Sequence, residues 1–132
     1  MTVVSQFSDL QGAQLSAVCF VRSYVELNFD GPILRLLAPP VVSYAGKTLQ
    51  FPAERSRDAL CALIGRTVQH TEDLPDRLIV VFPNASIEMP KASPDAGPEV
   101  AHFVPLAEGI PDVASMVIWE NLTPTRDNAT PS

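Results

Sequence analysis

Two short stretches of the chain share one pattern, Leu10-Gln-Gly-Ala-Gln-Leu15 and Leu63-Ile-Gly-Arg-Thr-Val68, and they lie 53 residues apart. With the same offset, Val25-Glu-Leu-Asn-Phe29 falls on Leu78-Ile-Val-Val-Phe82, and no gap is needed between residues 10 and 36. Self-similarity at a fixed offset is the signature of a repeated supersecondary unit. We therefore predict an internal duplication, with repeat one at about 10–36 and repeat two at about 63–89.

Each repeat predicts three strands joined by turns. Val25, Leu27 and Phe29 alternate with polar residues, which is typical of a half-buried strand. The next turns, Asp30-Gly-Pro32 and Pro83-Asn-Ala85, contain residues that tolerate positive φ, as a short hairpin requires. In repeat two, residues 78–82 are apolar throughout, which indicates a strand covered on both faces and favours repeat two as the centre of the sheet.

The remaining segments predict one helix and a few further strands. Residues 52–65 form the helix, with Leu60, Leu63 and Ile64 on one apolar face and Gly65 at its end. Residues 47–51 and 100–106 predict strands, 90–98 a polar loop and 115–120 a last, buried strand. We expect one domain over residues 1–122 and a disordered tail over 123–132.

These elements predict an α+β fold that is mostly antiparallel β. Two pseudo-equivalent β-meanders share a core, with one helix connecting them. A barrel-like roll is the favoured arrangement because closure removes exposed strand edges, and a two-layer β-sandwich is the alternative.

Composition excludes several classes of function. The 132 residues include 9 Lys and Arg against 15 Asp and Glu, a net charge of −6. Nucleic acids and anionic membranes both require cations, so neither is an expected partner. No signal peptide and no membrane-spanning stretch is evident, and we expect a cytoplasmic protein. Cys19 and Cys61 are then expected to be free, buried thiols, with a disulfide as the alternative.

The histidines are the only candidates for chemistry. His70 and Glu72 would face the same side of a strand, with Asp73 beside them, but a zinc site needs three or four ligands and a solvated strand end is the favoured interpretation. His102 has no carboxylate after it until Glu108, so a half-buried histidine on the polar side of a strand is favoured. We predict no catalytic residue, metal ligand or cofactor.

Aromatic residues offer a possible binding surface. Tyr24, Phe51, Phe103 and Trp119 lie on predicted strands or at their ends, where aromatic side chains belong more often to the core. Tyr24 is the best surface candidate because its strand alternates polar residues outward.

The doubled pattern of Leu-x-Gly-x-x-Val and Leu-x-Val-x-Phe-x-Asn, together with Trp119 in a late strand, resembles small uncharacterised bacterial proteins. Those proteins carry an L-x-G-x-x-V strand followed by an L-x-F-x-x-G hairpin, and some of them look like accessory or immunity proteins. The resemblance covers about residues 10–119, although Asn84 stands where glycine is usual. It implies an accessory role without catalysis, and it transfers no functional residue.

Three functions remain open. The leading hypothesis is a non-catalytic protein-interaction or accessory domain that binds a basic protein surface or forms a homodimer. The second is a small-molecule-binding β-barrel with a pocket lined by Tyr24, Phe103 and Trp119. The third is a small metal-dependent or histidine-dependent enzyme, which would require His70 and His102 to meet in the fold.

Overall fold

The computed structural model describes residues 6–22 and 24–123. It is an α+β structure that is mostly antiparallel β, as predicted. One α-helix, α1 (Ser56–Cys61), and two short 3-10 helices, η1 (Phe7–Leu10) and η2 (Val113–Ser115), accompany the strands. The strands are β1 (Ala17–Val21), β2 (Tyr24–Asn28), β3 (Ile33–Leu36), β4 (Val41–Tyr44), β5 (Lys47–Gln50), β6 (His70–Asp73), β7 (Arg77–Phe82), β8 (Ala85–Pro90), β9 (Glu99–Val104), β10 (Leu106–Ala107), β11 (Ile110–Pro111) and β12 (Val117–Glu120).

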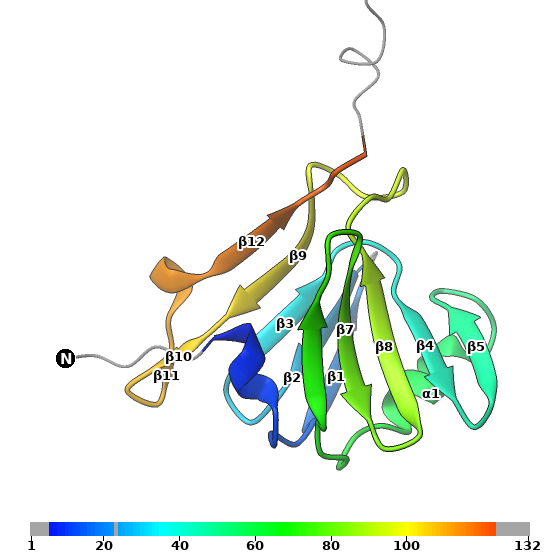
Figure 1. Cartoon of the computed structure of the whole chain (residues 1–132), viewed down its shortest axis with the longest axis horizontal. Helices are drawn as coiled ribbons and strands as arrows, with labels where there is room; N and C mark the ends of the chain where they lie inside the picture. The colour runs from blue at the N-terminus through cyan, green and yellow to red at the C-terminus, as the bar shows by residue number, and fades with distance from the viewer. Residues whose placement is uncertain (1–5, 23, 124–132) are drawn as a thin grey trace, which may run out of the picture.

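The longer strands form two five-stranded sheets with the orders β1-β2-β3-β9-β12 and β5-β4-β8-β7-β6, and β10 pairs only with β11. Both large sheets are open, and no pairing among the described strands closes either one (Figure 1). Each sheet contains the three strands of one predicted repeat. The two repeats therefore lie in separate sheets, and the expectation that repeat two occupies the centre of a common sheet is wrong.

The two sheets have the same plan. The meander β1-β2-β3 is extended by β9 and β12, and the meander β6-β7-β8 is extended by β4 and β5. In both cases the extending strands follow the other meander in sequence, so the chain crosses between the sheets after β3 and again after β8 (Figure 1). Each sheet therefore combines one meander with two strands that follow the other meander in the chain, and the two halves of the chain form one unit.

The backbone contacts between the halves come in pairs that the 53-residue offset interchanges. Gly12 N donates to Val68 O at 2.8 Å, and Gly65 N donates to Leu15 O at 2.7 Å. The same exchange relates two further bonds, Leu15 N to Arg66 O and Val68 N to Ala13 O. At the centre, Gln14 and Thr67 form an antiparallel bridge. Positive φ values of 86° and 92° at Gly12 and Gly65 give the chain the same bend at both places.

One apolar core lies between the sheets. Val25, Leu27 and Phe29 are buried as their alternation predicts. Four of the five residues in 78–82 are buried as well, since only Val81 is half-buried, so the double-faced coverage of β7 is largely confirmed. Residues from both sheets belong to a single cluster of buried side chains.

The helix is shorter than predicted. It begins at Ser56, whose buried side chain donates to Ala53 O at 2.6 Å within a turn, and it ends at Cys61. Leu60 and Leu63 are buried, but Ile64 is 43% exposed. The backbone leaves α-helical geometry after Ala62, so the i, i+4 spacing no longer places Ile64 on the face of Leu60.

Two predictions of burial are wrong. Both cysteines are free, as expected, but both are exposed, because Cys19 points away from the core on β1 and Cys61 lies on the open face of α1. The last strand, β12, is an edge strand with exposed Val117 and Ile118. The predicted tail at 123–132 lies outside the described residues except for Thr123. No helix in the described part of the chain is long and apolar enough to cross a membrane.

Candidate interaction surface

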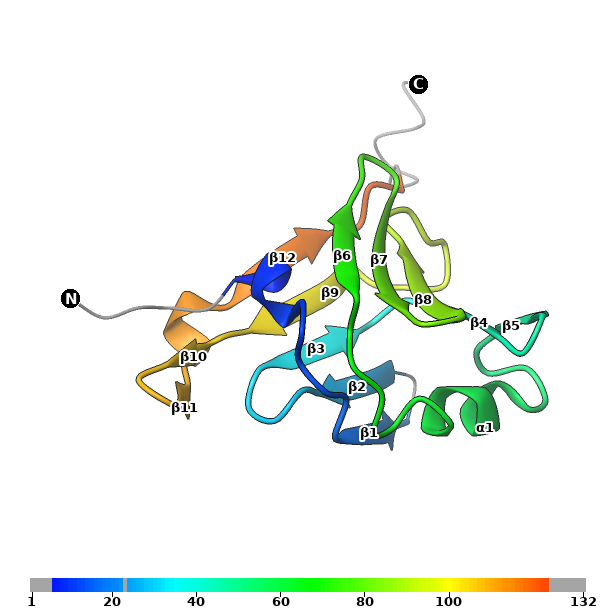
Figure 2. The ribbon, with the colours of Figure 1, turned by 60° about the horizontal axis from the view of Figure 1, so that its bottom comes forward.

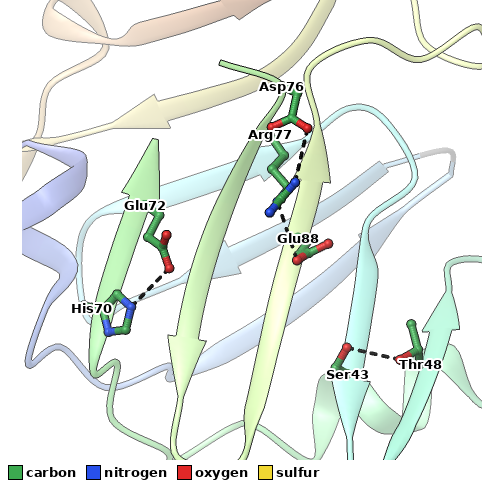
Figure 3. Close-up of polar contacts among 7 residues, drawn as sticks. All are labelled: Ser43, Thr48, His70, Glu72, Asp76, Arg77 and Glu88. Carbon is green, nitrogen blue, oxygen red and sulfur yellow. Dashed lines mark hydrogen bonds and ion pairs between the residues drawn. The ribbon is translucent and has the colours of Figure 1, made fainter. Parts of the chain in front are cut away.

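His70 lies on edge strand β6 with its predicted neighbour. Its Nε2 is 3.2 Å from Glu72 Oε2, and both side chains point to the same side of the strand (Figure 3). Both are largely exposed, with side-chain exposures of 49% and 40%. The arrangement fits a solvated strand end. Asp73 is not part of this pair, since its carboxylate interacts with Lys91 and Trp119 instead.

His102 has a carboxylate partner that the sequence analysis missed. Its Nε2 is 2.6 Å from Glu99 Oε1, three residues before it on β9. Residues three apart on a regular strand face opposite sides, but the pairing of β9 with β12 shifts register opposite Glu99. Arg35 is paired with His102 on the neighbouring strand β3 and lies 3.7 Å from Glu26. His102 thus lies beside the Glu26–Arg35 ion pair on the outer face of its sheet.

The two histidines lie in different sheets, each with its own carboxylate. Within residues 6–22 and 24–123, no group of three or more histidine, cysteine, aspartate or glutamate side chains could hold a metal ion.

The predicted aromatic surface is divided. Phe103 is fully buried and Phe51 nearly so, while Tyr24 is half-buried on the outer face of β2. Trp119 differs because it lies on edge strand β12 and its indole is held from two sides. Its Nε1 donates to Asp73 Oδ2 at 3.3 Å, and the ring of Phe7 meets it edge to face at 5.4 Å.

Trp119 forms one wall of a surface hollow of about 470 Å³. The rest of it is lined by Val117 of β12, by Asp73 at the end of β6, by Phe7 and Ser8 of η1, and by the polar residues Gln6 and Ser115. In Figure 2, η1 lies between β12 of one sheet and β6 of the other. The hollow therefore opens where the edges of the two sheets approach each other, and most of its lining is apolar.

The segment that leads into β12 carries an unusual number of exposed apolar side chains. We call residues 105–120 the arm, which comprises β10, β11, η2 and β12 (Figure 1). Ile110 and Val113 are 68% and 62% exposed, and Val117 and Ile118 are 42% and 44% exposed. An exposed apolar edge strand is a site of pairing with another chain.

The arm also has a one-sided charge. Between Lys91 and Arg126 the sequence contains no lysine or arginine, but it contains five acidic residues: Asp95, Glu99, Glu108, Asp112 and Glu120. This stretch accounts for −5 of the net charge of −6. The net charge of the whole chain does not show where its acidic residues are concentrated. The absence of cations from one segment was the signal that could have located this surface.

Comparison with known protein families, with curated proteins and with solved structures found no significant match.

Proposed function

We propose that this protein is a non-catalytic protein-interaction domain that binds a partner through the arm. The observation that carries the proposal is edge strand β12, where Val117 and Ile118 are exposed and no strand among the described residues pairs with the outer side. Natural proteins blunt such edges with charges, prolines or covering elements, because an open apolar edge pairs with other chains. An edge left open in this way fits a surface that is covered when the partner is bound.

The duplication belongs to the same proposal. We infer that residues 10–36 and 63–89 descend from one β-meander unit, and that the two pseudo-equivalent units share a rolled core. The common plan of the two sheets and the paired hydrogen bonds around Gln14 and Thr67 support this inference. An accessory or immunity-like role and a cytoplasmic location are in keeping with it.

A site-specific cross-linking experiment tests the proposal. A photo-reactive amino acid replaces Ile118 in one variant and Ile64 in another, since the two side chains are equally exposed, at 44% and 43%, but Ile64 lies beside α1. We expect one protein from the host to be cross-linked through position 118 and not through position 64. That protein is then identified and purified, and its affinity for the unmodified chain is measured.

The matched substitutions Ile118→Lys and Ile64→Lys complete the test. A buried apolar anchor at an interface contributes at least about 1.4 kcal/mol, a tenfold change in affinity. We expect Ile118→Lys to weaken binding of the purified partner at least about tenfold and Ile64→Lys to leave it unchanged. Equal effects of the two substitutions would refute an interaction surface on the arm.

A small-molecule ligand in the hollow is the second candidate function. The observation in its favour is the wall formed by Phe7, Val117 and Trp119, with the Asp73 carboxylate beside them. Native mass spectrometry of protein purified from its host would then give a discrete added mass of a small molecule. That added mass should disappear on replacement of Trp119 by alanine in a chain that remains folded.

A further inference from the structure

The edge of β12 that no described strand pairs with lies next to the hollow. Val117 and Trp119 line the hollow, and in the sheet they are opposite Phe103 and Ala101, whose side chains belong to the core. The hollow therefore lies on the inner side of β12. A strand added to this edge of β12 would direct every second side chain toward this side, because side chains alternate along a strand.

Charge decides what kind of segment fits there. The arm itself contains three acidic residues, Glu108, Asp112 and Glu120, and no lysine or arginine. Glu108, Asp112 and Glu120 are not among the described ion pairs with lysine or arginine. Two cations lie nearby, but both already have carboxylate partners: Arg35, which lies 3.9 Å from Met116 of the arm, pairs with Glu26, and Lys91 pairs with Asp73. The three carboxylates of the arm would attract a cationic segment, whereas a second copy of this chain would bring like charges together.

We propose that the partner adds an extended, cationic segment to edge strand β12 and places one apolar side chain in the hollow between Phe7, Val117 and Trp119. This inference rests on the proposed function and specifies its mode of binding. Main-chain hydrogen bonds to the edge supply affinity in such β-strand addition, and pockets for alternate side chains supply specificity. Here the hollow is the pocket and the acidic arm selects the charge.

NMR spectra of the full chain, which show one signal for each backbone amide and one for the indole N–H, give a direct test with synthetic peptides. The probe is acetyl-Thr-Lys-Leu-Lys-Val-Thr-amide, which alternates apolar and cationic side chains. We expect it to shift the backbone amide signals of Val117 and Ile118 and the indole N–H signal of Trp119, the single tryptophan of the chain. The amides of β5, the corresponding edge of the other sheet, are the internal control and should not shift.

Changes to the peptide test each part of the proposal without disturbing the fold. Replacing both lysines by glutamate tests charge, N-methylation of alternate backbone amides tests strand pairing, and replacing the leucine by glycine tests the hollow. We expect each change to weaken binding at least about tenfold, equivalent to about 1.4 kcal/mol. Equal binding of the glutamate or the N-methylated peptide would overturn the proposal, as would equal shifts of the β5 and β12 amides.

The outcomes for partner and peptide separate the two proposals. If Ile118→Lys abolishes partner binding while the lysine peptide shifts no β12 amide, the interaction surface stands and strand addition is overturned. If Ile118→Lys leaves partner binding unchanged, the proposed function itself fails. A dimer of the chain alone that dissociates on Ile118→Lys would overturn the cationic partner in favour of a second copy.

Discussion

The hairpin β4–β5 and the pair β9–β12 occupy the same position in their respective sheets, yet they are built differently. A two-residue turn with positive φ at both Ala45 and Gly46 joins β4 to β5. Residues 105–116, which include the hairpin β10–β11 and η2, separate β9 from β12. One sheet thus joins these two strands by a minimal turn, and the other joins them by a long segment.

The two edge strands differ in the same sense. On β5, the exposed residues Lys47, Thr48 and Gln50 are polar, and α1 packs against this strand. On β12, Val117 and Ile118 are exposed and Glu120 is the only charged residue. A polar, partly covered edge resists pairing with other chains, whereas an apolar edge favours it. The long connecting segment and the exposed apolar edge strand therefore belong to the same sheet.

Side chains from both sheets pack together at two corners of the molecule, one near β5 and one near β12, and the contacts differ between them. At the β5 side, Phe20 and Phe51 stack at 5.9 Å, and the Arg57 guanidinium lies 4.9 Å from the Phe51 ring centre. At the β12 side, Phe7 meets Trp119 edge to face, and the indole N–H reaches Asp73. The first corner has a hollow of about 400 Å³ beside Gln50, Phe51 and Pro52, and the second has the hollow of about 470 Å³ beside Trp119. Of the two corners, the one at Trp119 lies beside the exposed apolar edge strand, and we therefore expect binding there.

The largest effect is expected where the halves should behave alike. Phe29 and Phe82 are related by the 53-residue offset and are 2% and 1% exposed. Truncation of a buried phenylalanine to alanine costs about 3–5 kcal/mol. We expect Phe29→Ala and Phe82→Ala to lower the free energy of unfolding by similar amounts in that range, measured by urea denaturation. If one substitution costs less than half of the other, the halves are not energetically equivalent.

A smaller effect is expected at the paired bends. A side chain added at Gly12 or Gly65 would meet no atom within 4 Å, so strain at positive φ is the main cost. A residue with a Cβ in that region costs about 1–2 kcal/mol. Gly12→Ala and Gly65→Ala should each reduce unfolding free energy by that amount, again in urea. Losses that differ by more than the error of the fits would mean that the two bends are not interchangeable.

Loss of one side-chain contact at either corner is expected to lower the free energy of unfolding by about 1 kcal/mol. Trp119→Phe removes the hydrogen bond to the half-exposed Asp73, and such bonds contribute about 0.5–1.5 kcal/mol. Arg57→Met removes an exposed cation–π contact of about 0.5–1 kcal/mol. Thermal and urea unfolding of both variants measure the two losses. A stability of Trp119→Phe equal to that of the parent chain would show that the bond to Asp73 does not hold the indole in place.

Much of the fold could be predicted from the sequence because burial and alternation are local properties. The alternation of Val25, Leu27 and Phe29 with polar residues predicts that these three side chains are buried. Gly65 predicts the end of its turn because glycine tolerates positive φ. The crossing of strands between sheets is a property of pairing at long range, and the sequence carries no local signal for it. For the same reason, two sheets could not be distinguished from one.

The candidate surface was missed for a different reason. Residues 115–120 have the composition of a buried strand, and an edge that binds another protein has the same composition as one that is buried in its own core. Glu99, the partner of His102, lies three residues before it, and on a regular strand the two side chains would face opposite sides. The register shift between β9 and β12 brings them together, and strand alternation alone does not predict such a shift. The only sequence signal for the arm was its lack of lysine and arginine.

The smallest effect on stability, and the sharpest contrast between the halves, is expected from charges placed on the two edges. Ile118→Lys and Thr48→Lys both change exposed side chains, so each should alter the free energy of unfolding by no more than about 0.5 kcal/mol. Their effects on solubility should differ. A lysine on an apolar edge strand reduces pairing with other chains, but a further lysine on β5 changes little because that strand already contains Lys47.

We therefore expect Ile118→Lys to raise the protein concentration at which ammonium sulfate precipitates the isolated chain, and Thr48→Lys to leave it nearly unchanged. Since both substitutions add the same charge, any difference between them reports the edge and not the net charge of the protein. Equal gains would mean that the apolar edge of β12 is not exposed to other chains in solution. The contrast between β5 and β12 would then lose its functional meaning, although the difference in their construction would remain.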